Sequence, residues 1–241
     1  MRIFLAGASG VIGRRLMPLL VSAGHAVVGT TRSADKANML RACGVEPVIV
    51  DVFDGSALHK AVAAARPQVV IHQLTDLPDV LDAVHRTETL ARNSRLRVEG
   101  TANLVAATRA VSAHRLIAQS IAFAYAGGPE PHAEGDPIAS AAGDEPSAVT
   151  ARGVLALEDA VLGSPGLAGI VLRYGRLYGP GTWNTPNARA PLHVDAAARA
   201  ASLAVTRGAP GIYNIAEDDG AVAIEKARSE LGFDPAFRLK D

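Results

Sequence analysis

Cysteine and net charge are both nearly absent from this sequence. Its 241 residues include a single cysteine, Cys43, and 24 basic residues that balance 24 acidic ones. One cysteine cannot form an internal disulfide, and the seven histidines do not follow the spacing of a zinc motif, so we expect no bound metal. A neutral chain also lacks a broad electrostatic attraction for nucleic acid or an anionic membrane. We therefore expect a small-molecule partner or none, and neither nucleic acid nor membrane.

Long apolar runs are absent as well. Only four apolar residues lie between Arg2 and Gly7, which is too few for the core of a secretory signal. No other segment has the apolar length that crossing a bilayer requires. These absences predict a cytoplasmic protein.

Lysine and tyrosine are scarce, with four residues of each. None of the tyrosines is followed by a lysine four residues later, and the stretch between Lys60 and Lys226 contains no lysine. A tyrosine and a lysine one helical turn apart share a helix face, where the cation lowers the pKa of the phenol. Chemistry that depends on a tyrosine and a lysine together therefore has few ways to be built in this chain.

Short apolar runs alternate with helical patterns along the chain. The runs predict strands at 2–6, 26–30, 47–51, 68–72, 115–119, 169–174 and 211–215. Apolar residues spaced three and four apart predict helices at 11–23, 56–65, 87–112, 147–162 and 194–206. Nearly continuous apolar strands indicate a sheet that is buried on both faces. The alternation predicts a single α/β domain over 1–241, a Rossmann-type doubly wound parallel sheet of about seven strands.

Glycine, proline and acidic residues gather in two segments, 126–146 and 179–191. Both follow predicted strands, so they should lie over the carboxyl edge of the sheet, where open α/β folds bind ligands. We therefore expect small substrate-side elements at 126–146, 175–195 and 216–241. Surface loops without a role are the alternative for the two segments.

Three glycines come directly after the first predicted strand and open the first predicted helix. In this context the first glycine makes a tight turn, the second lets backbone N–H groups approach a pyrophosphate, and the third allows close packing of helix and strand. The helix N-terminus adds a partial positive charge for the anion. A glycine-rich turn without a ligand is the alternative. The predicted dinucleotide contacts are Gly7, Ser9, Gly10, Val11, Ile12 and Gly13.

The second predicted strand ends at Thr31 and Arg32, without the acidic residue that usually binds the adenosine ribose of NAD. An arginine beside hydroxyl groups suits a 2′-phosphate, so we expect NADP, with NAD as the alternative. Arg14 and Arg15 are candidates for a second cationic contact. Exposed helix residues without a role are the alternative for both.

Two other strand ends should face the cofactor. Asp51 and Val52 close the third strand, where the adenine would lie. Gln73 and Leu74 follow the fourth strand, near the expected nicotinamide ribose. We expect all four residues to contact the cofactor.

Further segments occur in the order that is typical of one family. They are Val98-Glu99-Gly100-Thr101-Ala102-Asn103-Leu104, Ala118-Gln119-Ser120 leading to Tyr125, Glu134-Gly135-Asp136-Pro137, Leu172-Arg173-Tyr174-Gly175, Tyr178-Gly179-Pro180-Gly181, His193-Val194-Asp195 and Gly211-Ile212-Tyr213-Asn214-Ile215-Ala216. Over residues 1–216 the chain resembles the NAD-dependent epimerase/dehydratase branch of the short-chain dehydrogenase/reductase superfamily. The resemblance implies an NAD(P) cofactor that Gln119 and Arg97 also contact, Arg97 standing where the family commonly has asparagine. It also implies a homodimer, which members often form through the helices at 87–112 and 147–162.

The catalytic pair of that family is missing. Its members carry a tyrosine and, four residues later, a lysine on the helix after the fifth strand. Aligning Glu158 with the glutamate of that helix places Thr150 and Val154 at those two positions, and neither side chain supplies an acid or a cation. Ser120 resembles the serine that orients the substrate oxygen, with one extra residue before Tyr125, which is the best remaining phenol. The candidate catalytic residues are therefore Ser120, Tyr125 and Thr150.

The part that binds substrate in this family is also short here. Only 11 residues separate Gly181 from His193, and 25 follow Ala216. Within the resemblance, this implies a much reduced C-terminal substrate subdomain and a substrate smaller than a nucleotide sugar. We expect an atypical NADP-dependent oxidoreductase or epimerase relative that acts on a small molecule. The alternative is a non-catalytic NADP(H)-binding sensor or scaffold protein.

Overall fold

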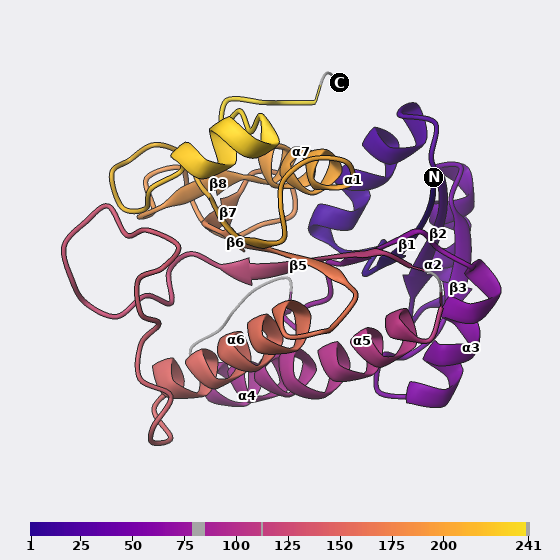
Figure 1. Cartoon of the computed structure of the whole chain (residues 1–241), viewed down its shortest axis with the longest axis horizontal. Coiled ribbons are helices and arrows are strands. Elements are labelled where there is room, and N and C mark those ends of the chain that lie inside the picture. Colours follow the sequence, from indigo (N-terminus) through magenta and orange to yellow (C-terminus); the bar gives the residue numbers. More distant parts are fainter. Residues whose placement is uncertain (79–84, 112, 240–241) are drawn as a thin grey trace.

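Seven strands form one parallel sheet in the computed structural model, which describes residues 1–78, 85–111 and 113–239 (Figure 1). Their order is β3-β2-β1-β4-β5-β6-β9, and all neighbours are parallel. The strands are β1 (Arg2–Ala6), β2 (Ala26–Thr31), β3 (Glu46–Ile49), β4 (Val69–His72), β5 (Arg115–Ile121), β6 (Ala168–Tyr174) and β9 (Gly211–Ile215). Every strand ends within two residues of its predicted limits, and the doubly wound α/β fold is confirmed.

The sheet is buried on both faces because side chains alternate along each strand. In β1, Ile3 and Leu5 enter one apolar core, whereas Phe4 and Ala6 enter the other. Burying one large apolar side chain contributes roughly 1.5–3 kcal/mol. The two cores therefore hold the sheet between two layers of helices.

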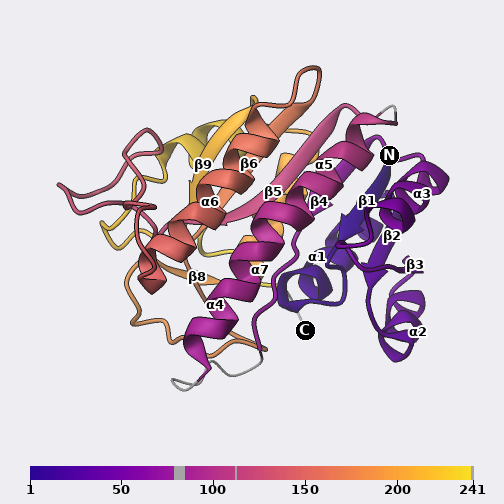
Figure 2. The ribbon, with the colours of Figure 1, turned by 90° about the horizontal axis from the view of Figure 1, so that it is seen from below.

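Helices cover the two faces in separate layers (Figures 1 and 2). One layer consists of α1 (Val11–Ser22), α2 (Ala34–Ala42) and α7 (Val194–Ala204). The other consists of α3 (Gly55–Ala65), α4 (Arg86–Arg95), α5 (Thr101–Arg109) and α6 (Pro146–Leu162). Figure 2 shows α4 and α6 side by side across that second face. None of the helices in the described part of the chain is long and apolar enough to cross a bilayer.

A π-helical turn, η1 (Leu96–Gly100), joins α4 to α5. The sequence predicts one helix over 87–112, and the helix does run through both elements, with this wider turn inside it. The predicted last residue, Ser112, lies outside the described residues. A π-helical turn adds one residue to the α-helical register. The spacing of apolar residues by three and four, from which the helix was predicted, does not reveal such an insertion. The turn buries Arg97.

Small elements lie beyond the carboxyl ends of β5, β6 and β9, in the predicted substrate-side segments. They are β7 (Arg176–Tyr178), β8 (Pro191–His193) and the π-helical turn η2 (Ala227–Leu231). β7 and β8 form a two-stranded parallel sheet. A bridge between His132 and Val222 ties the segment at 126–146 to the C-terminal part. These contacts, and a small apolar cluster around Ala190, give the two predicted loops a fixed place over the sheet.

Candidate functional site

The glycine turn joins β1 to α1 where the strand order reverses. β1 lies between β2 and β4, the position at which open α/β sheets bind ligands. Gly7 has a φ of 87°, in the left-handed region that favours glycine. A Cβ on Gly13 would lie 2.3 Å from the carbonyl oxygen of Gly7, so the absence of a side chain lets α1 pack close to the turn.

The first turn of α1 presents N–H groups to an anion. Gly10 is the N-cap residue, and no side chain caps the helix there. The N–H groups of Val11 and Ile12 consequently have no intrahelical acceptor. Such N–H groups beside a glycine turn fit a pyrophosphate, because donors and helix dipole both favour negative charge. The predicted contacts from Gly7 to Gly13 thus come together at one turn.

Hydroxyl groups at the end of β2 hold this turn in place. Thr30 Oγ1 accepts a hydrogen bond from the Gly7 N–H at 3.0 Å, and Ser9 Oγ donates to Thr31 Oγ1 at 3.2 Å. Thr31 Oγ1 also accepts from the N–H of Ser33. Thr31 is buried, so its hydroxyl fixes the geometry between the glycine turn and the end of β2.

Arg32 stands at the surface next to this turn. Its side chain is 62% exposed, and Nη2 lies 3.4 Å from Asp76 Oδ1, in an exposed ion pair of little strength. The N-terminus of α2 follows two residues later and adds to the local attraction for an anion. Of the other two predicted cations, Arg15 is bound to Asp195 of α7, whereas Arg14 is exposed.

Asp51 and Val52 form the loop that follows β3. Asp51 Oδ1 accepts a hydrogen bond from the Phe53 N–H at 2.9 Å, and the residue is exposed at the carboxyl edge of the sheet. Val52 is buried, and its carbonyl oxygen accepts from Asn103 Nδ2 at 2.9 Å. These bonds fix the loop at the end of β3, where the adenine contact is predicted.

Gln73 carries an unsatisfied buried atom beside the glycine turn. Its Nε2 donates to the Tyr174 hydroxyl at 3.2 Å, but its buried Oε1 has no hydrogen-bond partner in the described part of the chain. A Cβ on Gly7 would lie 2.8 Å from the carbonyl oxygen of Gln73. The next carbonyl, of Leu74, accepts from Gln119 Nε2 at 2.9 Å, which ties β4 to β5. Buried polar atoms are normally satisfied, so Gln73 Oε1 is consistent with a ligand at this edge.

Arg97 is buried, with 9% of its surface exposed. A Cβ on Gly153 of α6 would lie 3.3 Å from Arg97 Cδ, so the arginine stem packs where that helix has no side chain. Among the described residues its guanidinium has no hydrogen-bond acceptor, although the Glu158 carboxylate acts on it through charge. Burial lowers the pKa of Arg97 to about 10, so the group stays cationic at neutral pH. The next residue on α6 is Val154, at the position where the resemblance predicts the lysine of the family.

The Tyr125 phenol is engaged on two sides. Its hydroxyl donates to Asn214 Oδ1 at 2.6 Å and accepts from Arg173 Nη1 at 2.9 Å, while its ring stacks on His132. Burial raises the pKa of Tyr125, although the nearby Arg173 opposes the rise. The Tyr125 hydroxyl therefore keeps its proton at neutral pH and donates it in a hydrogen bond to Asn214.

The other two predicted catalytic hydroxyls also have partners. Ser120 is buried and donates to Glu158 Oε1 at 2.7 Å. Thr150 donates to the carbonyl oxygen of Pro146, within its own helix, at 2.8 Å. The structure therefore places Ser120 as a support for the Glu158 carboxylate and leaves Thr150 without an acidic proton.

His72, close by, is fully buried between the helices and the sheet. Its Nδ1 accepts from the Leu74 N–H at 3.2 Å, and its Nε2 lies 3.0 Å from the Thr101 hydroxyl. Burial, aided by the charge of Arg97, lowers the pKa of His72 to about 4. The imidazole is therefore neutral near pH 7 and is not poised to give up a proton.

A buried ion pair that the sequence did not predict organises these side chains. Arg173 of β6 donates to both carboxylate oxygens of Glu158, at 2.9 and 2.6 Å, and the two side chains are 4% and 5% exposed. The signal that could have found this pair is a lone arginine in an apolar strand and a lone acid on the buried face of a helix. Their bonds to Ser120 and Tyr125 make the carboxyl end of β5 rigid.

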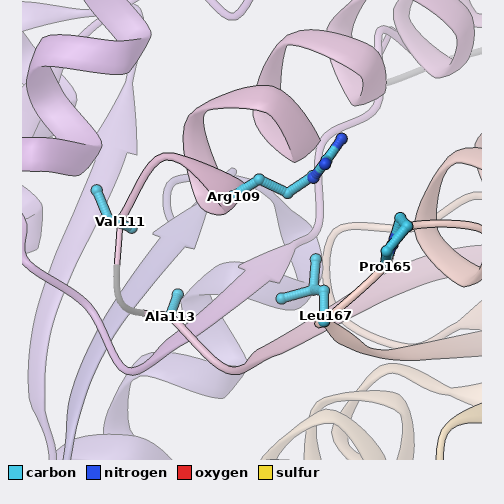
Figure 3. A pocket seen from close by; sticks show the side chains of 6 residues that line it. Arg109, Val111, Ala113, Pro165 and Leu167 are labelled. Atoms are coloured by element: carbon cyan, nitrogen blue, oxygen red, sulfur yellow. The ribbon is translucent and has the colours of Figure 1, made fainter.

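Two hollows open at opposite edges of the sheet. The amino-edge hollow, of about 220 Å³, lies at the starts of β5 and β6, away from the glycine turn (Figure 3). It is lined by Arg109, Val111, Ala113, Pro165, Gly166 and Leu167. None of the predicted site residues lines it, so it has no part in the site.

The carboxyl-edge hollow, of about 230 Å³, lies where β5 and β6 end. Its lining includes Phe123, Tyr125, Glu130, Arg176 and Arg189. Arg32 and Asp51, the predicted contacts of the adenosine half, lie toward β2 and β3. This hollow is on the other side, where the nicotinamide half of a dinucleotide extends. Phe123 and Arg176 were not among the predicted site residues, although each follows a strand end at the ligand-binding edge.

The family model described as the NAD dependent epimerase/dehydratase family matches residues 3–191. The chain belongs to this family. The predicted resemblance is thereby confirmed, together with the NAD type of cofactor on which the family depends. The glycine turn, the donors of α1 and the unsatisfied Gln73 Oε1 fit such a dinucleotide.

One protein with a similar sequence is named as a reductase. The protein named 3-diazoavenalumate denitrifying reductase, from a Streptomyces species, is 42% identical over 246 residues. The match covers 93% of this chain and 79% of that protein.

Solved structures of epimerases share the fold. UDP-glucose 4-epimerase of Thermotoga maritima, solved with UDP-glucose, superimposes with a TM-score of 0.78 at 17% identity, over 99% of this chain and 94% of its own. UDP-glucuronic acid 4-epimerase of Bacillus cereus, solved with UDP-glucuronic acid and NAD, gives 0.78 at 16% identity, over 99% and 95%. At this identity the likeness shows the fold alone.

Proposed function

We propose that this member of the epimerase/dehydratase family is an NADPH-dependent reductase that removes N₂ from an aryl diazonium compound. The observation that carries the proposal is that the three predicted catalytic hydroxyls are all engaged by protein acceptors in the described part of the chain. Tyr125, Ser120 and Thr150 each hold their proton in a bond to a protein acceptor, and the family's tyrosine and lysine are absent. The substrate class comes from the Streptomyces relative, whose name describes a denitrifying reductase of a diazo acid.

A diazonium group is an acceptor that needs no acid. The nicotinamide, when bound, supplies a hydride. Addition of hydride to the terminal nitrogen of R–N₂⁺ gives the neutral diazene R–N=N–H, and loss of N₂ from the diazene leaves R–H. The sum, R–N₂⁺ plus H⁻ giving R–H plus N₂, balances without an added proton. Reduction of a carbonyl group, by contrast, produces an alkoxide that requires a general acid.

A comparison of two matched acceptors tests the proposal. Purified protein with NADPH is given an aryl diazonium acid or the aldehyde of the same skeleton, and NADPH absorbance is followed against a protein-free blank. We expect NADPH to be oxidised faster with the diazonium compound, by about 10²-fold or more. Reduction of the aldehyde needs a general acid, and an acid at the site would contribute a rate increase of about that size. Equal rates would contradict the proposal. A flat trace with both acceptors, with clear NADPH binding, would favour the non-catalytic sensor or scaffold.

Arg97 has a place in this proposal as the cation that binds the cofactor in place of the missing lysine. Its side chain is 9% exposed and packs through Cδ against Gly153, its guanidinium carries a charge, and it has no hydrogen-bond acceptor among the described residues. Ribose hydroxyl groups of the nicotinamide half would supply such acceptors. The buried charge lowers stability before the cofactor binds, as is common at functional sites.

Arg97→Met should therefore change stability and binding in opposite directions. We expect the Tm of the cofactor-free protein to rise, because a buried cation is removed. The affinity for NADPH should fall by about tenfold, as expected for the loss of a charged hydrogen bond. Calorimetry and a fluorescence titration measure the two effects. The control is Arg95→Met, since Arg95 is exposed and paired with Glu99 on the same helix.

The double variant Arg97→Asn, Val154→Lys moves the cation onto α6 and should recover most of the lost affinity. An unchanged NADPH affinity in Arg97→Met would contradict the role of Arg97.

NADP is the proposed form of the cofactor, on the strength of Arg32 and the start of α2. We expect NADPH to bind at least about tenfold more tightly than NADH, and Arg32→Ala to remove most of that difference. Arg41→Ala serves as control, because Arg41 lies in the last turn of α2. Fluorescence titration with both cofactors measures the ratio. Equal affinities in the unaltered protein would show that Arg32 does not select NADP.

A further inference from the structure

The carboxyl-edge hollow contains an arginine whose charge is not matched by the protein. Arg176 follows β6 and lies over the ring of Phe123, with 4.3 Å between the guanidinium carbon and the ring centroid. No acceptor or ion-pair partner for its side chain occurs among the described residues. Its surroundings are unfavourable for a cation, because burial and the charge of Arg86 both lower its pKa. An arginine remains protonated in such a place and gains from an anion.

The other charges in this hollow cancel. Arg189 is in contact with the Glu130 carboxylate, so this pair contributes no net charge. The remaining walls are the stacked rings of Tyr125 and His132, the latter bound to the Asp136 carboxylate, and small apolar residues such as Ala190. The hollow therefore has one unmatched positive charge.

The same hollow has an aromatic surface for a planar group. Phe123 is 41% exposed, so part of its ring is open to a ligand. Its ring forms one side of the hollow, next to the Arg176 guanidinium. The volume of about 230 Å³ lies below the roughly 300–1,000 Å³ typical of drug-sized ligands. A volume of this size matches a small planar molecule better than a nucleotide sugar.

We infer that this hollow binds a small conjugated organic acid, with its carboxylate on Arg176 and its unsaturated part against Phe123. The inference rests on the proposed function, for which it names the substrate class. An acid held there would have its far end free to point toward β4 and the nicotinamide side of the glycine turn. Guanidinium groups bind carboxylates with two parallel hydrogen bonds, and such a bond would fix the orientation of the acid. Arg176 is in this account a specificity-determining residue.

Binding of an unreactive acid tests this inference apart from any turnover. Cinnamate and its uncharged analogue cinnamamide are titrated into the NADPH-loaded protein and followed by calorimetry. We expect cinnamate to bind at least about tenfold more tightly than cinnamamide, because only the acid forms charge-assisted hydrogen bonds. Arg176→Gln should abolish this difference and leave NADPH affinity unchanged. The matched control is Arg109→Gln in the amino-edge hollow, which should preserve the difference.

The possible results separate the two proposals. Equal affinities for cinnamate and cinnamamide, or a preference that survives Arg176→Gln, would overturn the assignment of Arg176. Arg176→Lys keeps the charge without the planar fork, and an intermediate preference in that variant supports carboxylate recognition. The protein could prefer cinnamate through Arg176 and yet not oxidise NADPH with diazonium acids. That result would support the acid-binding site and contradict the proposed reductase function.

Discussion

Gly10→Val is expected to abolish NADPH binding and to leave the protein folded. Gly10 has φ −76° and ψ 177°, a conformation that any residue adopts. A Cβ at this position meets only the Gly7 carbonyl oxygen, at 3.3 Å, which a shift of a few tenths of an ångström relieves. The valine side chain would, however, occupy the approach to the first N–H groups of α1. We expect a loss of at least about 10²-fold in affinity, since several hydrogen bonds to the pyrophosphate are blocked together.

A fluorescence titration and a thermal melt measure the two parts of this prediction. Gly13→Val is the informative contrast, because its Cβ would lie 2.3 Å from the Gly7 carbonyl oxygen and 2.5 Å from that of Ala8. That variant should lose the fold as well as the cofactor. If Gly10→Val is folded and binds NADPH as the unaltered protein does, the assignment of this turn to the pyrophosphate is wrong.

Arg173→Leu is expected to destabilise the protein by about 3–5 kcal/mol, because it leaves the Glu158 carboxylate buried without its partner. Arg173 forms two bonds with Glu158 and one each with the Tyr125 hydroxyl and the Glu134 carbonyl oxygen. For a chain of this length, the loss corresponds to a fall in Tm on the order of 10 °C. Differential scanning calorimetry measures it.

The partner variant separates the ion pair from simple packing. Arg173→Leu combined with Glu158→Leu removes both charges and should recover part of the lost stability, since no unpaired charge stays buried. The exposed ion pair of Arg228 and Asp218 provides the control, and Arg228→Leu should change Tm little. A small effect of Arg173→Leu would show that the carboxylate finds another partner and that the pair does not hold β5, β6 and α6 together.

The sequence predicted the sheet well because its strands are short, nearly continuous apolar runs, as in the alternation of Ile3, Phe4 and Leu5 between two cores. It missed α2, in which only Ala37 and Leu40 are buried, so its apolar pattern is weak. That helix is stabilised at its start by Ser33, whose hydroxyl accepts from the N–H of Lys36. The N-cap therefore helps to define a helix that the spacing of its apolar residues does not reveal.

The sequence predicted the glycine turn of the site, which depends on backbone conformation. It predicted less well the side chains whose role depends on being buried. Three glycines at fixed spacing define the turn after β1, because the steric demands of that turn act on the residues themselves. The resemblance placed Arg97 at the cofactor, but its burial, like the position of Arg176, could be seen only in the structure. Arginine is mostly exposed, and sequence does not show that a π-turn buries one side chain or that a strand end brings another over Phe123. The resemblance showed that the tyrosine and lysine of the family are missing from this chain. The structure showed that the hydroxyl groups of Tyr125 and Ser120 both donate to protein acceptors.

The stoichiometry of nitrogen release tests the central proposal most directly. An aryl diazonium acid labelled with ¹⁵N in both nitrogens is incubated with the protein and NADPH, and ¹⁵N₂ is measured by mass spectrometry beside NADPH oxidation. Hydride reduction without a protein acid predicts one N₂ for each NADPH consumed, above a blank with the Gly10→Val variant. It also predicts a rate that changes little between about pH 6 and 8, because His72 is neutral there and the pKa of Tyr125 is raised. Release of N₂ that does not depend on NADPH, or oxidation of NADPH without N₂, would contradict the proposed function.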